Sequence, residues 1–155
     1  IEGAVPALRA LRAQALVTQV RAGINQDLQP LDEAETEAGA LIELAPDAVI
    51  MVNAYHDLFL VEENRGQLNR DVLASLKPGG VYGIIDHAAA VGAGSSAVQS
   101  LHRIEKKTVV DEVTAAGFKL GGESNILANA ADDHTAKIFD LDGKTDKFVL
   151  RFEKP

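Results

Sequence analysis

The sequence predicts an α/β protein with neighbouring parallel strands. Two continuous apolar runs, 47–53 and 81–85, are rich in β-branched residues and short enough to be strands. Such runs are typical of strands that are buried on both faces of a parallel sheet. A segment with helical periodicity, 64–76, lies between them, and the order strand, helix, strand is that of a parallel α/β unit.

Length and composition limit the architecture and the partners. The chain has 155 residues, the length of one ordinary domain, and its 46% hydrophobic and 25% charged residues are a globular composition. The absence of Cys excludes a disulfide framework, a thiolate metal site and a cysteine nucleophile. The net charge of −8 repels phosphate backbones. We therefore expect a small-molecule substrate or a protein partner, and no nucleic-acid partner.

The sequence shows neither a membrane span nor a leader. No apolar run approaches the roughly 20 residues that cross a bilayer, and no basic-then-apolar segment opens the chain. We expect a soluble protein of the cytoplasm or periplasm, with no membrane partner. Because the chain begins with Ile1 rather than Met, we also expect a processed product or a piece of a longer protein.

The N-terminal segment, 1–45, is predicted to be helical and is acidic. Apolar residues recur at helical spacing over 6–20, which predicts an amphipathic helix. Between Arg21 and Arg65 there is no Lys or Arg, and acidic residues accumulate there. We interpret the part around 32–41 as a solvated helix or loop, with an acidic docking face as the alternative.

The rest of the chain continues the α/β pattern. In the helix over 64–76, Asn64 is a candidate N-cap, and the Pro-Gly-Gly that follows at 78–80 ends the helix. The segment 88–100 consists mostly of small residues and is rich in Gly and Ser, which predicts a loop. The remaining predicted elements are a helix over 108–116, strands over 118–123 and 147–152, and a turn at 142–144.

Polar residues follow both apolar strands, and they form the strongest candidate site. Asn53, Tyr55, His56 and Asp57 end the first strand, and Asp86 and His87 end the second. Ligands of open parallel sheets bind beyond the carboxyl ends of the strands, where an imidazole held by a carboxylate can act as a general base. In the structural alternative, His56 and Asp57 cap the next segment and Asp86 accepts backbone N–H groups.

Other polar groups carry weaker hypotheses. The same His and Asp residues would suffice as metal ligands, yet no tight ligand spacing is present, so no metal site is assigned. His102 and Arg103 either close over the site or bind an anion, or they form a surface pair. We interpret His134, beside Asp132 and Asp133, as part of an exposed loop cluster.

Two common catalytic loops are not found in the sequence. The Gly-Ala-Gly-Ser-Ser segment at 92–96 has neither the Lys of a P-loop nor the third Gly of a dinucleotide fingerprint. The sequence also contains no Gly-x-Ser-x-Gly nucleophile elbow. We therefore interpret 92–96 as a flexible loop.

Four motifs together resemble a known family. They are Asn-x-Tyr-His-Asp-Leu at 53–58, Leu-Lys-Pro-Gly-Gly at 76–80, Ile-Asp-His at 85–87 and Leu-His-Arg-Ile at 101–104. This set resembles the C-terminal part of class I S-adenosylmethionine-dependent methyltransferases, especially a bacterial group of predicted methyltransferases. The similarity spans roughly 46–155, and Gly117 with the strands after it resembles the closing hairpin of that family.

The resemblance implies a fold, a reaction and roles for residues. The fold would be a Rossmann-like, doubly wound, mostly parallel sheet with an antiparallel last strand. One domain would cover 1–155, with the later strands and helices in 46–155. The reaction would be methyl transfer from S-adenosylmethionine to a small molecule. Asn53, Ala54 and Tyr55 would lie beside the cofactor, and the predicted catalytic residues are Tyr55, His56, Asp57, Asp86, His87 and His102.

The sequence departs from that family at its start. The Gly-x-Gly-x-Gly turn that holds the cofactor is not found in 1–45, and no acidic residue for the ribose hydroxyls can be located. The fold would then lack its N-terminal cofactor-binding strand. The rival hypothesis is a non-catalytic binding or oligomerisation module, a homo-oligomer whose copies pair through an open sheet edge.

Overall fold

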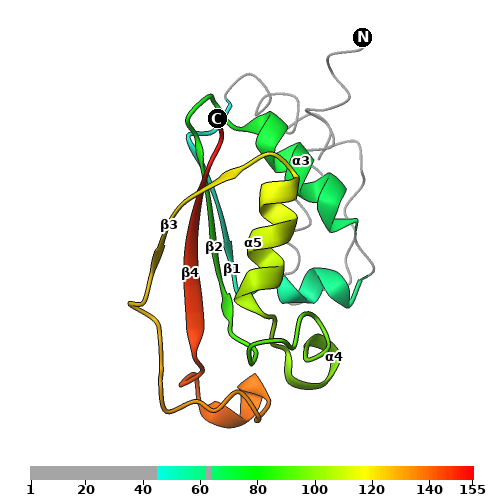
Figure 1. Cartoon of the computed structure of the whole chain (residues 1–155), viewed down its shortest axis with the longest axis vertical. Helices are drawn as coiled ribbons and strands as arrows, with labels where there is room; N and C mark the ends of the chain where they lie inside the picture. Colours follow the sequence, from blue (N-terminus) through cyan, green and yellow to red (C-terminus); the bar gives the residue numbers. More distant parts are fainter. Residues whose placement is uncertain (1–44, 62–63) are drawn as a thin grey trace, which may run out of the picture.

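The computed structural model describes residues 45–61 and 64–155 (Figure 1). The predicted helix over 6–20 and the acidic segment around 32–41 lie outside these residues. Four strands, β1 (Ala48–Val52), β2 (Val81–His87), β3 (Lys119–Ser124) and β4 (Lys147–Glu153), form one sheet in the order β1-β2-β4-β3. Three of them run in one direction, and β4 is antiparallel to both of its neighbours. The predicted α/β fold, with a mostly parallel sheet and an antiparallel last strand, is confirmed.

Strands β1 and β2 are the parallel neighbours that the two apolar runs predict. Val52 is in register with Ile85, and the backbone N–H of Asn53 donates to the carbonyl of Ile85 at 2.7 Å. Tyr82 and Ile84 of β2 are fully buried on one face, whereas Val81, Gly83 and Ile85, which alternate with them, are partly exposed. The residues that follow β1 therefore emerge beside the end of β2.

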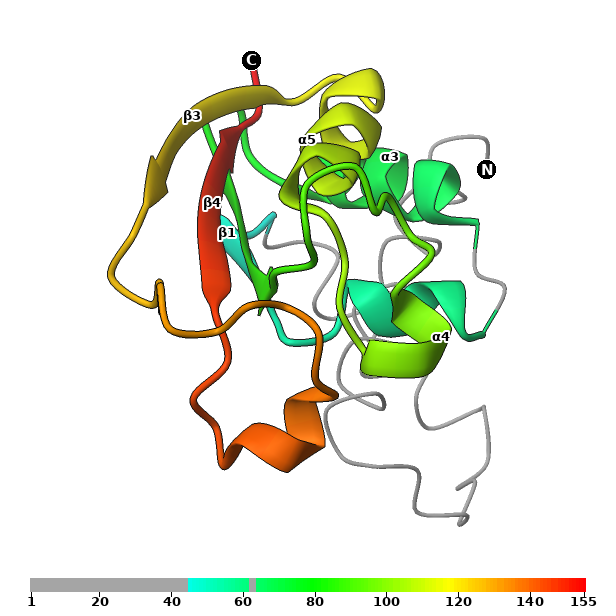
Figure 2. The ribbon, with the colours of Figure 1, turned by 60° about the horizontal axis from the view of Figure 1, so that its bottom comes forward.

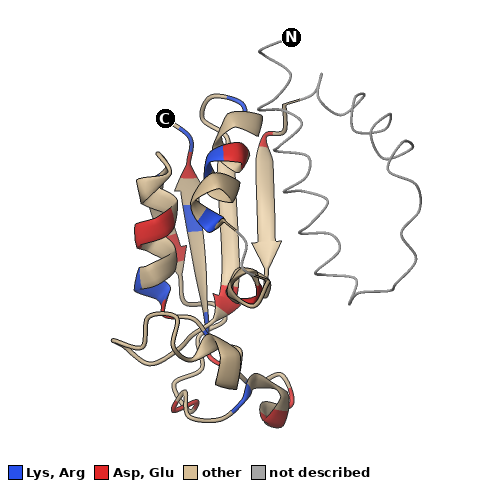
Figure 3. Cartoon of the chain, turned by 90° about the vertical axis from the view of Figure 1, so that its right-hand side faces the viewer, with Lys and Arg blue, Asp and Glu red and all other residues tan. Residues whose placement is uncertain are grey.

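Helices α3 (Arg65–Ser75) and α5 (Lys106–Ala115) lie side by side over one face of the sheet (Figure 2). Asn64 is the N-cap of α3, as predicted, because its side chain accepts the backbone N–H of Gln67 at 3.0 Å. Both helices also carry charged residues of both signs (Figure 3). Amphipathic helices of this kind bury one stripe against a sheet and keep the other in water.

Strand β4 lies between β2 and β3 rather than at an edge of the sheet. Its pairing with β3 confirms the predicted antiparallel strand pair. The connection between them includes η2 (Ile138–Leu141) and a turn in which Asp142 and Gly143 have positive φ. The predicted turn at 142–144 is thus present.

The segment predicted as a loop over 88–100 is only partly a loop. Its end belongs to a one-turn helix, α4 (Val98–Leu101), so the prediction is wrong there. Gly92 and Gly94 donate their backbone N–H groups to the carboxylate of Glu105 at 2.9 and 2.7 Å. These two hydrogen bonds lower the pKa of Glu105. The amides that a phosphate loop would present are therefore already used by the protein itself.

In the described part of the chain, no helix is both long and apolar enough to cross a membrane.

Candidate functional site

The candidate site lies where β1 and β2 end. A short helix, η1 (His56–Phe59), follows β1 and presents His56 and Asp57. The last two residues of β2 are Asp86 and His87. Because β1 and β2 are parallel neighbours, these two pairs of residues meet at one edge of the sheet, as the sequence predicts.

Asp86 holds His56 through both of its carboxylate oxygens. Its Oδ1 lies 2.7 Å from Nδ1 of His56, and its Oδ2 accepts the backbone N–H of His56 at 2.8 Å. Oδ1 also accepts the backbone N–H of His87 at 2.8 Å. The side chains of Asp86 and His56 are 0% and 2% exposed. Asp86 therefore agrees with both the predicted site and its structural alternative, because it orients an imidazole and also accepts backbone N–H groups.

Asp57 connects His56 with a third imidazole. Its Oδ1 lies 3.1 Å from Nε2 of His56 and 3.6 Å from Nδ1 of His102. His102 is the C-cap of α4 and adopts a left-handed conformation with φ of 54°. The His56 ring is edge-on to the rings of His102 and His87, at centroid distances of 5.7 and 5.8 Å. Five predicted catalytic residues thus form one histidine cluster: His56, Asp57, Asp86, His87 and His102.

The charges of the cluster follow from these contacts. Burial disfavours the charged form of His56, but the hydrogen bonds and charges of Asp57 and Asp86 outweigh it and raise the pKa of His56 to about 9. Partial burial opposes ionisation of Asp57, yet the hydrogen bond and charge of His56, with a contribution from His102, lower its pKa. In the protein without a ligand, His56 is therefore a cation between two carboxylates at neutral pH.

His87 is chemically different from His56. Its Nδ1 lies 2.7 Å from Oγ1 of Thr145, which is itself buried. Burial lowers the pKa of His87 to about 4, and the charge of Asp86 offsets this only in part. His87 is therefore neutral at pH 7. Thr145 cannot be recognised from the sequence, because nothing in the spacing of the residues connects it to His87.

The structure does not bring the Tyr55 hydroxyl into the cluster. Tyr55 is fully buried, its hydroxyl donates to Glu112 at 2.8 Å, and it accepts from the Asn69 side chain at 2.9 Å. Burial, with a contribution from Glu112, raises the pKa of Tyr55. Glu112 also binds the guanidinium of Arg65. This hydroxyl joins α3 and α5 to the end of β1, so its surroundings are those of a structural group.

The two residues before Tyr55 line the turn out of β1. Ala54 is buried, and Asn53 has a positive φ of 50°. Oδ1 of Asn53 is buried and accepts no hydrogen bond from the described residues. An unpaired buried acceptor is costly, and one at a strand end is suited to a donor on a ligand.

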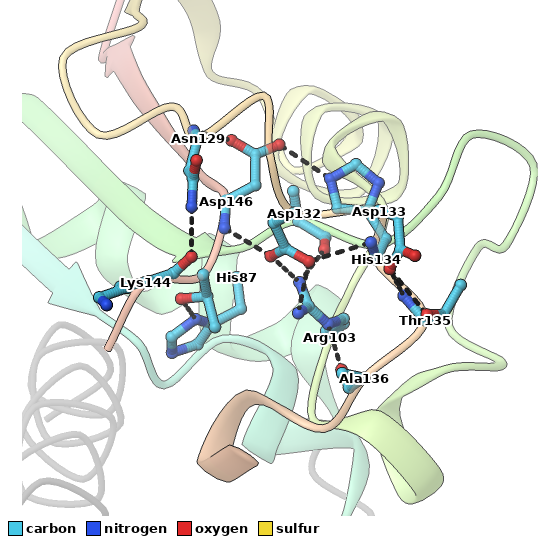
Figure 4. Close-up of polar contacts among 12 residues, drawn as sticks. His87, Arg103, Asn129, Asp132, Asp133, His134, Thr135, Ala136, Lys144 and Asp146 are labelled. Carbon is cyan, nitrogen blue, oxygen red and sulfur yellow. Dashed lines mark hydrogen bonds and ion pairs between the residues drawn. The ribbon is translucent and has the colours of Figure 1, made fainter. Parts of the chain in front are cut away.

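Arg103 has a different role from either of those considered for it. It is fully buried and pairs with Asp132 at 2.9 Å (Figure 4). It also donates to the carbonyl oxygens of Ala88 and Ala136, each at 2.9 Å. A guanidinium with all these partners is neither a surface group nor open to an anion. Arg103 instead fixes the loop that carries His102.

The cluster around His134 is likewise more buried than the sequence indicates. The side chain of Asp132 is 2% exposed and accepts the backbone N–H groups of His134 and Asp146. Nε2 of His134 lies 2.9 Å from Oδ2 of Asp146 (Figure 4). The prediction of an exposed loop cluster is therefore wrong for Asp132, while Asp133 is exposed as expected.

Comparison with known proteins yields similarity of structure without similarity of sequence. No family model matches the sequence, and no curated protein matches it. One similar solved structure is the [4+2]-cyclase SpnF, with 18% identity, a TM-score of 0.49, and coverage of 72% of this chain and 50% of that chain. Another is an S-adenosylmethionine-dependent methyltransferase from Mesorhizobium loti, with 14% identity, a TM-score of 0.43, and coverage of 69% and 61%.

A third is the N-methyltransferase NodS from Bradyrhizobium japonicum WM9, with 14% identity, a TM-score of 0.47, and coverage of 83% of this chain and 71% of that chain. Two of these three structures are methyltransferases. This chain spans only half the length of the cyclase. All three TM-scores lie below 0.5, so function has to be argued from the site.

Proposed function

We propose that this chain is methyltransferase-like and transfers a methyl group from S-adenosylmethionine to a small-molecule acceptor. One observation carries the proposal: three motifs of the family resemblance each contribute to the histidine cluster. The Tyr-His-Asp motif contributes His56 and Asp57, the Asp-His motif contributes Asp86 and His87, and the Leu-His-Arg motif contributes His102. Motifs that are separate in sequence and share one site are expected of a functional centre.

The residues at the end of β1 fit one side of a cofactor site. The resemblance places Asn53, Ala54 and Tyr55 beside the methionine part of S-adenosylmethionine. The unpaired Oδ1 of Asn53 supports this placement, because it needs a donor that the described residues do not supply. S-Adenosylmethionine contributes a methyl group on a positively charged sulfur.

The histidine cluster is proposed to bind the acceptor and receive its proton. A lone pair of the acceptor forms the new bond to the methyl carbon while the carbon–sulfur bond breaks, and its electron pair stays on sulfur. The acceptor proton passes to an imidazole or carboxylate of the cluster. His102 and Asp57 are 28% and 29% exposed, whereas His56 is 2% exposed. The acceptor therefore meets the cluster from the side of His102 and Asp57, and the chain acts mainly by orienting it.

The first test is binding of the product cofactor. S-Adenosylhomocysteine should bind the purified chain saturably, near one per chain, in a calorimetric titration on protein of confirmed intact mass. An Asn53→Gly variant should bind more weakly, because it removes the unpaired Oδ1 while Gly suits the positive φ of 50° at this position. If the intact chain shows no heat of binding, the proposed activity of this chain is excluded.

A second test separates the acceptor side from the cofactor side. His102→Gly should lower turnover on any accepted substrate while leaving S-adenosylhomocysteine binding unchanged. Gly suits the positive φ of 54° at this position, so the variant should fold. His134→Asn is the matched control, since Asn also tolerates the positive φ of His134. A loss of turnover in both variants alike would contradict the assignment of the acceptor side.

A binding or oligomerisation module is the second candidate. One observation favours it: among the described residues, β1 pairs with β2 alone, and Ile50 on β1 is 55% exposed. A strand edge of this kind can pair with another chain. In that case the chain should not bind S-adenosylhomocysteine, and the midpoint temperature of its thermal unfolding should rise with protein concentration.

A further inference from the structure

All four histidines of the sequence lie in the described part of the chain, and three of them meet in the histidine cluster. Two of these imidazoles share one carboxylate oxygen of Asp57. We propose that His56, Asp57 and His102 form a binding site for one divalent transition-metal ion, with Zn²⁺ as the probe. This inference goes beyond the proposed function and does not rest on it.

The spacing of the donor atoms is close to what such an ion needs. Zinc binds His nitrogen at about 2.0–2.1 Å and carboxylate oxygen at about 2.0–2.2 Å, and a tetrahedron with such bonds separates its ligand atoms by about 3.3 Å. Asp57 Oδ1 lies 3.1 Å from Nε2 of His56 and 3.6 Å from Nδ1 of His102. One ligand atom from each of the three residues lies within 4.8 Å of the others. Small side-chain movements would therefore complete the site.

An independent contact orients the most buried ligand. Nδ1 of His56 lies 2.7 Å from Asp86 Oδ1, so this nitrogen carries a hydrogen and Nε2 is directed at Asp57. Metal-binding histidines typically donate their other N–H to a carboxylate in this way, which fixes the tautomer and strengthens the ligand. Asp86 is in turn fixed by two backbone N–H groups, from His56 and His87.

The site is closed on one side and open on the other. His56 is buried, whereas Asp57 and His102 are each more than a quarter exposed. Three protein ligands leave a fourth position for water or a substrate oxygen, which is the pattern of catalytic rather than structural zinc. Two imidazoles and one carboxylate also suit iron, cobalt and nickel. A bound ion would sit where His56 and Asp57 now share a hydrogen bond.

The test is direct binding of metal to the full chain after treatment with a chelator and gel filtration. Titration with ZnCl₂ should give saturable binding near one ion per chain, measured by calorimetry and by elemental analysis after desalting. Co²⁺ should give visible absorption bands of the intensity typical of four- or five-coordinate sites. A simple His–Asp–His hydrogen-bonded chain predicts neither result.

Variants assign the binding to these residues. His102→Gly should weaken Zn²⁺ binding by at least about 100-fold, since losing a ligand costs more than the 10- to 100-fold expected for an outer-shell partner. Asp57→Asn should weaken it as well. His134→Asn should bind like the wild type, because His134 and Asp146 lie outside the cluster. Equal binding by wild type and His102→Gly, or no binding by the folded wild type, would overturn the proposal.

Discussion

Asp86 and His56 contact each other through both the side chain and the backbone of the histidine, at 2.7 and 2.8 Å. The contact joins the end of β2 to the start of η1, across the edge where β1 and β2 stop. A single buried carboxylate therefore positions a reactive side chain and closes the turn that carries it. Stability and site geometry depend on the same residue.

Replacing this carboxylate should be costly. Asp86→Asn loses charge-assisted hydrogen bonds in a fully buried position, and we expect a loss of about 3 kcal/mol in the free energy of unfolding. Urea denaturation measures this. Asp111→Asn is the control, because the i,i+4 pair of Asp111 with Lys107 is on the surface and its loss should change stability far less than the loss of Asp86. Equal effects in the two variants would contradict the role given to Asp86.

His87 should make the protein sensitive to acid. Its pKa is lowered to about 4 in the folded state, against about 6.5 in an unfolded chain. The unfolded state therefore binds the proton more readily, so stability is retained above pH 6.5 and falls as the pH drops toward 4, by at most about 1.4 kcal/mol per pH unit.

The measurement is the free energy of unfolding between pH 4 and 8 for wild type and His87→Asn, in which Asn can keep the hydrogen bond to Thr145. The variant should show a shallower acid limb. Near pH 8 the His87 imidazole is neutral in both the folded and the unfolded state. The difference in the free energy of unfolding between the two proteins should therefore no longer change with pH there. An NMR titration of His87 with a midpoint near 6.5 would contradict the prediction.

Tyr55→Phe should affect stability and leave ligand binding intact. The variant removes a buried hydroxyl that binds both Glu112 and Asn69, and we expect a loss of about 1–2 kcal/mol. Tyr82→Phe is a matched control, because its hydroxyl has only a weak contact with Met51 Sδ at 3.7 Å. Weaker binding of S-adenosylhomocysteine by Tyr55→Phe, at unchanged stability, would instead support a role for the hydroxyl at the cofactor.

Arg103→Lys should be far more damaging than its conservative appearance suggests. Lys cannot reach Asp132, Ala88 and Ala136 together, and the unpaired buried charges should cost about 3 kcal/mol. Arg151→Lys is the control, since Arg151 is exposed and pairs with Glu153 at the surface. Denaturation midpoints compare the two. If Arg103→Lys is as stable as Arg151→Lys, the buried pair does not hold the loop that carries His102.

The sequence was informative where the local signal is strong. The apolar runs predicted β1 and β2 because strands that are buried in a parallel sheet have little polar alternation. Asn64 predicted the start of α3 because a cap is a local interaction. The one-turn helix α4 was missed, since four residues carry no period.

The position of the site was predictable from the sequence, but the contacts between its side chains were not. Because the carboxyl ends of parallel strands meet at one edge of the sheet, the sequence predicts which residues share that edge: His56, Asp57, Asp86 and His87. The sequence does not predict that Asp132 is the partner of Arg103, because the two residues meet only through the tertiary fold. The direction of Tyr55 was also beyond the sequence, since a tyrosine after a strand can point toward the core or toward a ligand.

The place of β4 in the sheet has a consequence for how the protein is made. Among the described residues, strand β3 joins the sheet only through β4, and two of the three strand pairings involve β4. On the ribosome, β1 and β2 can pair as soon as both have emerged, but β3 must wait, unpaired, until residues 147–153 follow it. Thr145, the partner of His87, lies two residues before β4. The pairing of β3 and the Thr145 contact of His87 are therefore both supplied by residues 145–153, and a chain that stops before residue 145 has neither of these two contacts.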